Sequence, residues 1–318
     1  MKYVITGAAG YIGRNILNRL ALHDDEITAL IHSQEPKIFH PTIQYVQGDI
    51  SQPSFLESLP KDVDIVIHCA AMVKDYGWKK DFMNVNYRGT KYIVDHYQNS
   101  SIKQFIFLSH INYNKSSSFN YYAQTKKLAE EYLFHKWRTK QFPITIIRPG
   151  NVFGPDATIW VNNIIEAIRS NQFALIDDGQ ATFFHTYIDN LIDAIILSIG
   201  NKKVIGEAIN ITDDDYQITW KKYFSDLSQI MNMPIPQRNI SKKMAYLLAY
   251  LFMLRFFVSQ KKPWITPAAV QLLTAQKEIS LEKSKRLLNY TPFVDYGSAI
   301  EKIKSWWNSK TSSSKEQN

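Results

Sequence analysis

The stretch VITGAAGYIG, residues 4–13, decides the fold that we predict for this chain. A short apolar strand at its start runs into three glycines with the spacing G-x-x-G-x-x-G. A helical pattern of apolar residues follows, at Ile12, Ile16, Leu17 and Leu20. A strand, a glycine turn and a helix in this order are typical of the first unit of a dinucleotide-binding domain. The spacing therefore predicts that a nucleotide with a pyrophosphate group binds here.

Each glycine of this turn has its own role in the prediction. Gly7 permits the tight turn, Gly10 lets the backbone approach the pyrophosphate, and Gly13 allows the helix to pack closely on the strand. Tyr11 and Ile12 begin the helix, whose free N–H groups and positive dipole end attract phosphate. We assign these five residues to cofactor binding.

Short apolar strands alternate with helical segments through the first half of the chain. The strands are expected at 27–31, 45–46, 65–69, 105–108 and 144–148, and the helices at 82–97 and 122–138. This alternation predicts an α/β domain with a doubly wound parallel sheet of the Rossmann type over residues 1–155. Residues 156–308 are expected to form mainly a smaller, mostly helical substrate domain, with segments near 185–212 returning to the first domain. The polar residues 309–318 predict a disordered tail.

Composition narrows the functions to consider. The 318 residues suggest about two domains, and 45% hydrophobic residues exclude disorder for most of the chain. Cys69 is the single cysteine, so no internal disulfide can form, and we assign no metal ligands. The net charge of +8 comes entirely from residues 241–318, with 13 basic and 5 acidic residues, so nucleic-acid binding is not expected. The immediate first strand leaves no room for a secretory signal, and we expect a cytoplasmic protein.

Tyr122 and Lys126 lie four residues apart in an expected helix and so share one face. A nearby cation lowers the pKa of a phenol, which is ordinarily about 10. Such a tyrosine can take a proton from an alcohol while hydride leaves the same carbon, or return one to a carbonyl. Tyr121, in contrast, meets Thr125 four residues later. We therefore predict that Tyr122 is the acid/base and Lys126 its electrostatic partner.

Together with further motifs in the same order, these features resemble the extended short-chain dehydrogenase/reductase family, the NAD-dependent epimerase/dehydratase group. The motifs are GDI at 48–50, HCAA at 68–71, NVNYRGT at 84–90, RPGNVFGP at 148–155, HTYIDNL at 185–191 and GEAINI at 206–211. The resemblance implies positions for further cofactor-binding residues. It places Asp49 and Ile50 at the adenine, Ala70 and Ala71 along the dinucleotide, Asn86 as a brace of the sheet, and Pro149 and Val152 beside the nicotinamide.

The choice between NAD and NADP rests on the end of the second strand. An acidic residue there is typical of NAD binding and an arginine of NADP binding. This chain has His32 and Ser33 instead. Both tolerate a phosphate, so we expect NAD or NADP with a slight preference for NADP, and His32 joins the cofactor-binding residues.

The family places a serine or threonine at the end of the fifth strand, where it binds the reacting oxygen. Here His110 takes that position and Ser109 precedes it. Adjacent side chains of an extended segment point in opposite directions, so one of the two reaches the substrate. His110 can donate a hydrogen bond or a proton near neutral pH. The alternatives are Ser109 or a hydroxyl from residues 116–118, and lost catalysis, which would leave a non-catalytic NAD(P)-binding redox sensor.

An apolar segment at Met244–Val258 bears on the substrate. As a helix, fifteen residues reach about 22 Å, too short for a hydrocarbon core of about 30 Å. The segment either lies on an anionic membrane surface, flanked by lysines, or is buried as the lid of an apolar pocket. Both alternatives predict a hydrophobic substrate.

The C-terminal region, 262–307, and residues 71–77 resemble the 3β-hydroxysteroid dehydrogenase-like branch. This implies an NAD(P)-dependent oxidoreductase that interconverts a secondary alcohol and a ketone on a sterol-like molecule. A nucleotide-sugar epimerase or dehydratase is the alternative. The expected partner is a small hydrophobic molecule, with peripheral membrane contact and a homodimer as open expectations.

Overall fold

The computed structural model describes residues 1–111, 119–170, 173–213, 216–235, 237–276 and 279–315. Its centre is a seven-stranded sheet in the order β10-β6-β5-β4-β1-β2-β3, and every neighbouring pair is parallel. The strands are β1 (Lys2–Thr6), β2 (Glu26–Ile31), β3 (Ile43–Gln47), β4 (Ile65–His68), β5 (Gln104–Leu108), β6 (Ile144–Pro149) and β10 (Glu207–Ile211). This order confirms the doubly wound sheet predicted from the sequence.

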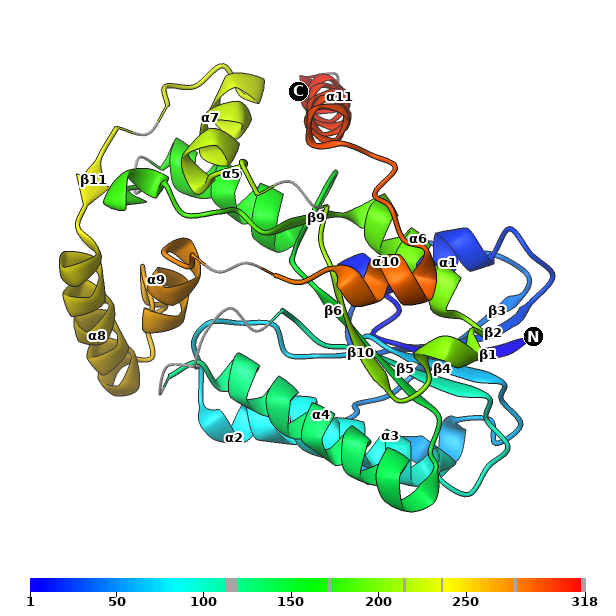
Figure 1. Ribbon diagram of the computed structural model, residues 1–318. Helices are drawn as coiled ribbons and strands as arrows, with labels where there is room; N and C mark the ends of the chain where they lie inside the picture. The colour runs from blue at the N-terminus through cyan, green and yellow to red at the C-terminus, as the bar shows by residue number, and fades with distance from the viewer. Residues whose placement is uncertain (112–118, 171–172, 214–215, 236, 277–278, 316–318) are drawn as a thin grey trace.

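Helices cover both faces of the sheet (Figure 1). One face carries α1 (Tyr11–Leu20) and α6 (Ile188–Ser198), with α10 (Glu282–Leu288) beside α6. The other carries α2 (Lys79–Phe82), the π-helical η2 (Met83–Gly89), α3 (Thr90–Tyr97) and α4 (Tyr121–Lys140). Because both faces are covered, the central strands β4, β5 and β6 are buried on both sides and are mostly apolar, whereas the edge strand β3 alternates with exposed polar residues.

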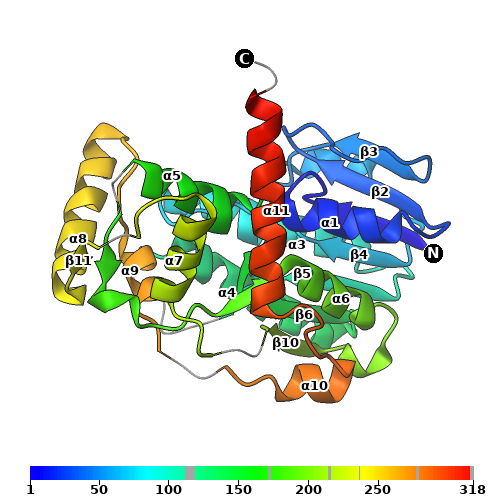
Figure 2. The same ribbon diagram turned by 90° about the horizontal axis from the view of Figure 1, so that it is seen from above.

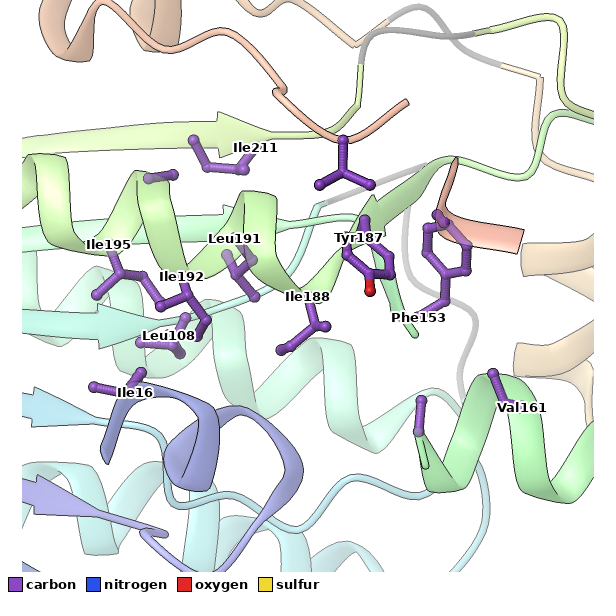
Figure 3. Packing of buried hydrophobic residues seen from close by; sticks show 14 of the residues in the cluster. Ile16, Leu108, Phe153, Val161, Tyr187, Ile188, Leu191, Ile192, Ile195 and Ile211 are labelled. Carbon is purple, nitrogen blue, oxygen red and sulfur yellow. The ribbon is translucent and has the colours of Figure 1, made fainter. Parts of the chain in front are cut away.

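The two faces have separate cores. On the α1 and α6 face, Ile16 packs near Leu108 and the α6 residues Leu191, Ile192 and Ile195 (Figure 3). On the α3 and α4 face, alternate residues of the same strands, among them Val4, Val66 and Phe105, pack against the helices. The helix residues of this core include Ile93 and Leu133. The alternation of strand residues between the two cores fixes the register of the sheet.

The order of the strands creates a switch point between β1 and β4. The chain leaves β1 into α1 on one face and leaves β4 towards α2 and α3 on the other. In open parallel sheets, ligands bind outside the carboxyl ends of the strands at such a point. Thr6, His68 and Leu108 end the central strands there.

The second half of the chain forms a group of helices beside the sheet (Figures 1 and 2). It contains α5 (Asn163–Arg169), α7 (Trp220–Ile230), α8 (Lys242–Ser259) and α9 (Pro267–Leu273), with the short strands β8 (Leu175–Ile176) and β11 (Asn239–Ile240). Two segments return to the first half: β10 joins the sheet beside β6, and β9 (His185–Tyr187) pairs with β7 (Asn151–Phe153). The short helical turns are η1 (Pro53–Ser58), η3 (Thr158–Asn162), η4 (Asp177–Gly179) and η5 (Lys202–Val204).

The last helix, α11 (Tyr296–Lys315), extends into the segment for which the polar composition predicts disorder. The hydroxyl groups of Thr311 and Ser312 donate hydrogen bonds to the Asn308 carbonyl oxygen, at 3.1 and 3.0 Å. Serine and threonine can bond back to the preceding helical turn in this way. Local hydroxyl bonding thus accommodates a helix in a sequence that composition alone assigns to a tail.

Candidate active site

The glycine turn brings three backbone segments into contact. Gly7 has a φ of +66°, and a Cβ atom built on it would lie 2.7 Å from the Ala70 backbone nitrogen. A Cβ atom on Gly13 would lie 2.3 Å from the Gly7 carbonyl oxygen. Both positions therefore require glycine, because β1, α1 and the segment after β4 pack backbone against backbone.

Gly10 is different, because space is open beside it. A Cβ atom there would meet one atom within 4 Å, the Gly7 carbonyl oxygen at 3.1 Å. Within the described residues, no side chain caps the start of α1 and no acidic residue lies in its first turn. The N–H groups of the helix start and its dipole can therefore receive an anion, and the turn fits a pyrophosphate.

A buried histidine that the sequence analysis left without a role ties the strand ends together. His68 shares hydrogen bonds with the hydroxyl groups of Thr6 at 2.6 Å and Thr90 at 2.9 Å. Ala70 donates its N–H to the same Thr6 hydroxyl, at 3.2 Å. Burial, assisted by the charge of Lys126, lowers the pKa of His68 to about 3. A neutral imidazole therefore holds Ala70 beside the glycine turn.

Asn86 connects the segment after β4 to the helix of the Tyr–Lys pair. Its Oδ1 accepts from the Met72 N–H at 2.7 Å, and its Nδ2 donates to the Met72 carbonyl oxygen and the Thr125 hydroxyl, both at 3.2 Å. The side chain is buried. It acts as a brace between Ala71 and Lys126, the sequence neighbours of its two partners.

Three of the expected adenosine-side residues lie together beyond β2 and β3. His32 Nε2 is 4.0 Å from Asp49 Oδ2, and Asp49 Oδ1 accepts from the Ser51 N–H at 2.8 Å. Ile50 is buried against Gly89, where a Cβ atom would lie 3.0 Å from the Ile50 Cδ1 atom. The structure thus brings His32 and Asp49 together at the edge of the strand ends.

Tyr122 and Lys126 lie in the first turns of α4. The Asn120 side chain caps this helix by accepting from the Ala123 N–H at 3.0 Å. Lys126 is 2% exposed, and its Nζ atom lies 4.0 Å from the centroid of the Phe107 ring on β5. Burial lowers the pKa of Lys126 to about 7. Lys126 is thus a deeply buried amine at the strand ends.

The expected lowering of the Tyr122 pKa is not found. Burial raises the pKa of this phenol above its ordinary value. Desolvation of the charged form explains the direction, since the phenolate loses more hydration than the phenol. Tyr122 is therefore protonated at neutral pH in this structure, as the acid form that gives a proton to a carbonyl.

The structure places His110 beside Tyr122, with 5.2 Å between the ring centroids. Burial lowers the pKa of His110 to about 4, so its imidazole is neutral at pH 7. The Ser109 hydroxyl and His110 Nδ1 are both buried without a hydrogen-bond partner in the described part of the chain. Unpartnered buried polar atoms are rare, and both can bind a ligand oxygen. The alternative hydroxyls at 116–118 lie outside the described residues.

The neighbouring strand end contributes Pro149 and Val152. The Pro149 carbonyl oxygen accepts from the Ile111 N–H at 3.0 Å, which joins the ends of β5 and β6. Val152 lies in β7, half-buried and paired with Thr186. Arg148 Nε donates to Glu130 Oε1 of α4 at 2.9 Å. This ion pair, which the sequence analysis missed, fixes α4 against β6 one helical turn beyond Lys126.

The class of extended short-chain dehydrogenases/reductases is defined by the features described above. These are a parallel sheet whose first turn fits a pyrophosphate, and a tyrosine and a lysine on one helix at the strand ends. Within this class, the chain belongs to the NAD dependent epimerase/dehydratase family, whose model matches residues 3–212. The resemblance seen in the sequence is thereby confirmed, and the protein is an enzyme of the NAD dependent epimerase/dehydratase type.

Relatives and solved structures match almost the whole chain. The chain is 26% identical to the Mus musculus protein "Sterol-4-alpha-carboxylate 3-dehydrogenase, decarboxylating", over 95% of this chain and 89% of that protein. It is 24% identical to the Escherichia coli O157:H7 "N-acetyl-alpha-D-glucosaminyl-diphospho-ditrans,octacis-undecaprenol 4-epimerase", over 88% and 87%. The Bacillus cereus UDP-glucuronic acid 4-epimerase structure with UDP-glucuronic acid and NAD has a TM-score of 0.78, 22% identity, and coverage of 97% and 99%.

Proposed function

We propose that this protein interconverts a secondary alcohol and a ketone on a hydrophobic molecule, with Tyr122 as the proton donor and acceptor. The proximity of Tyr122, His110 and Lys126 at the carboxyl ends of the central strands carries this proposal. The two rings are 5.2 Å apart, and the charge of Lys126 acts on His68 and His110, which follow β4 and β5. This is the edge of the sheet where the glycine turn begins α1.

Each side chain has a separate task. The glycine turn and the residues beside it, with Ala70, Ala71, Pro149 and Val152, would hold the dinucleotide, which supplies or accepts the hydride. Tyr122 donates its phenolic proton to the carbonyl oxygen in reduction and receives it back in oxidation. Neutral His110 donates a hydrogen bond to the same oxygen, with Ser109 as the alternative donor.

Lys126 sets the balance of these proton transfers. Its pKa near 7 allows it to be charged or neutral at physiological pH. In the charged form it favours the phenolate of Tyr122. It therefore favours transfer of the Tyr122 proton to the reacting oxygen, which yields the alcohol. Burial opposes the phenolate and raises the pKa of Tyr122 in this structure, so a charged Lys126 would act against that burial.

A hydrophobic substrate is supported by the side chains around the start of α4. Phe119 contacts the Tyr121 ring at 6.4 Å, and Phe82 contacts it at 6.1 Å. Aromatic residues therefore surround the chain next to Tyr122. The relatives' names also point to hydrophobic molecules, a sterol in one case and an undecaprenol in the other. The second name keeps sugar epimerisation as the alternative activity.

The preference for NADP over NAD is part of the proposal. The His32 side chain is 69% exposed at the end of β2, beside Asp49, and can approach a 2′-phosphate. Mass spectrometry of the nucleotide retained by purified protein tests the preference. A His32→Asp substitution should move the affinity towards NAD, because a carboxylate repels the 2′-phosphate and accepts from the ribose hydroxyl groups.

Turnover of NADPH and NADH with hydrophobic cyclic ketones tests the function. Tyr122→Phe should reduce turnover by roughly 10²–10⁴-fold while dinucleotide affinity stays nearly constant. Tyr121→Phe is the matched control and should keep turnover within a few-fold. Steady cofactor consumption supports the oxidoreductase, whereas turnover of a sugar nucleotide without net consumption supports the epimerase. Unchanged turnover in Tyr122→Phe contradicts the mechanism.

A further inference from the structure

Helix α8 has an apolar stripe that faces away from the rest of the protein. Its members recur at intervals of three and four residues, which places them on one side of the helix. They are between 47% and 88% exposed, and are Met244, Leu247, Leu251, Leu254 and Val258. The opposite side of α8 is buried through Ala245, Ala249, Met253 and Phe256. One apolar side of the helix therefore packs against the rest of the protein, and a second apolar side is exposed to solvent.

The position of α8 in the fold agrees with an external contact. The helix lies at the outer edge of the molecule, remote from the sheet, in both views (Figures 1 and 2). Its inner side packs against α9. A lid over an apolar pocket, the other alternative from the sequence, would use the inner side of the helix and would leave the stripe without a partner. The exposure of the stripe contradicts a fully buried helix.

The charge around the stripe identifies its partner. Between Asp226 and Glu278 the chain has no acidic residue and seven basic ones. Five of these border the stripe and are exposed: Lys242, Lys243, Arg255, Lys261 and Lys262. A second copy of the chain would bring these like charges together, which disfavours pairing through α8. An anionic lipid surface complements both the charges and the apolar stripe.

We propose that α8 docks on the surface of an anionic phospholipid bilayer and lies parallel to it. The stripe enters the boundary of the acyl chains while the basic residues meet the headgroups. Trp264 is 71% exposed and packs on Phe252 with 5.8 Å between ring centroids, and tryptophan is a residue type enriched at membrane interfaces. Among the described residues, the structure contains no helix long and apolar enough to cross a membrane.

The inner side of α8 connects this surface to the active site. Phe257 contacts the rings of Trp78 at 5.3 Å and Phe119 at 6.1 Å, and Phe119 contacts Tyr121, the neighbour of Tyr122. The helix that faces lipid thus touches the aromatic residues at the start of the catalytic helix. If the proposed function holds, a membrane-dissolved alcohol or ketone reaches Tyr122 along these aromatic residues.

Sedimentation with vesicles tests the docking surface. The full chain is mixed with vesicles of phosphatidylcholine and phosphatidylserine, and with phosphatidylcholine alone. A Leu247→Gln/Leu251→Gln/Leu254→Gln variant should lose binding at least about tenfold, because the apolar contact with the acyl chains is removed. The matched control, Leu22→Gln/Phe39→Gln, changes two exposed apolar residues elsewhere and should bind like wild type. Omitting phosphatidylserine should weaken wild-type binding by roughly an order of magnitude.

Three results would overturn the proposal. The wild type could stay in the supernatant, or the triple variant could sediment like wild type. The third is light scattering that finds wild type as a dimer and the triple variant as a monomer. Turnover of a water-soluble ketone is measured on the same proteins. It should be equal in wild type and the triple variant, because the stripe does not touch the site. Failed sedimentation together with normal turnover rejects the docking surface alone. Unchanged turnover in Tyr122→Phe, together with normal sedimentation, rejects the proposed activity alone.

Discussion

The Nζ atom of Lys126 lies 4.0 Å from the centroid of the Phe107 ring, in a position that is 2% exposed. The ring attracts the ammonium group, but it does not replace the water that the group loses on burial. The pKa of Lys126 therefore falls to about 7, despite the opposing effects of Cys69 and Glu130. A lysine in this place destabilises the fold in its charged form, which is typical of a residue kept for function.

Substitution of this lysine separates stability from activity. Lys126→Met keeps the length of the side chain and removes the buried charge, so the free energy of unfolding at pH 7 should rise, by roughly 1–2 kcal/mol. The folded-state pKa lies below the unfolded value of 10.5, so wild type loses stability as the pH falls from 10.5 towards 7. The variant should lack this loss in urea unfolding at several pH values. Turnover should fall by about 10²-fold or more.

Lys127→Met is the control for that experiment, since the Lys127 side chain is exposed on the same helix. It should change neither the pH dependence of stability nor turnover. A Lys126→Met variant that is less stable than wild type at pH 7 would show that the ammonium group contributes more through its contacts than its burial costs.

His110 is predicted to act as a neutral hydrogen-bond donor. His110→Ala should reduce turnover by about 10²-fold with little change in dinucleotide affinity, because one donor to the reacting oxygen is lost. His110→Ser restores a hydroxyl at the position where the family has one, and should recover most of the activity. Burial holds the pKa of His110 near 4, so His110 does not titrate near pH 6.5. The pH profiles of turnover for wild type and His110→Ser should therefore have the same shape around pH 6.5. Equal losses in the alanine and serine variants would assign the donor role elsewhere, with Ser109 as the next candidate.

The sequence predicted those features that depend on local spacing. The apolar runs of the strands, the glycine turn and the i,i+4 placement of Tyr122 and Lys126 are of this kind. The hydrogen bond between His68 and Thr90 joins residues 22 apart, and no local pattern indicates it. The raised pKa of Tyr122 depends on how deeply α4 is buried, which periodicity does not report. For α8, apolar residues on all sides left open which side faces the protein.

Two buried histidines predict a loss of stability in weak acid. The pKa is about 3 for His68 and about 4 for His110 in the folded protein, against 6.5 for the unfolded chain. Between pH 6.5 and 4 the unfolded state alone takes up these protons, so the stability that the two histidines contribute is fully present above pH 6.5 and is lost as the pH decreases. The free energy of unfolding should decrease by up to about 2.7 kcal/mol per pH unit from the two groups. Urea titrations across this range measure the slope, and His110→Ser should remove about half of it. An unchanged slope in that variant would mean that His110 is protonated in the folded state.

The glycine turn offers a matched pair of substitutions. In Gly13→Ala the new Cβ atom would lie 2.3 Å from the Gly7 carbonyl oxygen, so α1 must move away from β1, and the thermal midpoint should drop by several degrees. In Gly10→Ala the new atom meets that oxygen at 3.1 Å and otherwise open space, so the fold should tolerate it. The same methyl group occupies the space into which we place the pyrophosphate, and dinucleotide affinity should fall by about tenfold or more. Calorimetry of NADH and NADPH binding, with melting curves of both variants, separates the two effects. Undiminished affinity in a well-folded Gly10→Ala protein would place the pyrophosphate away from this turn.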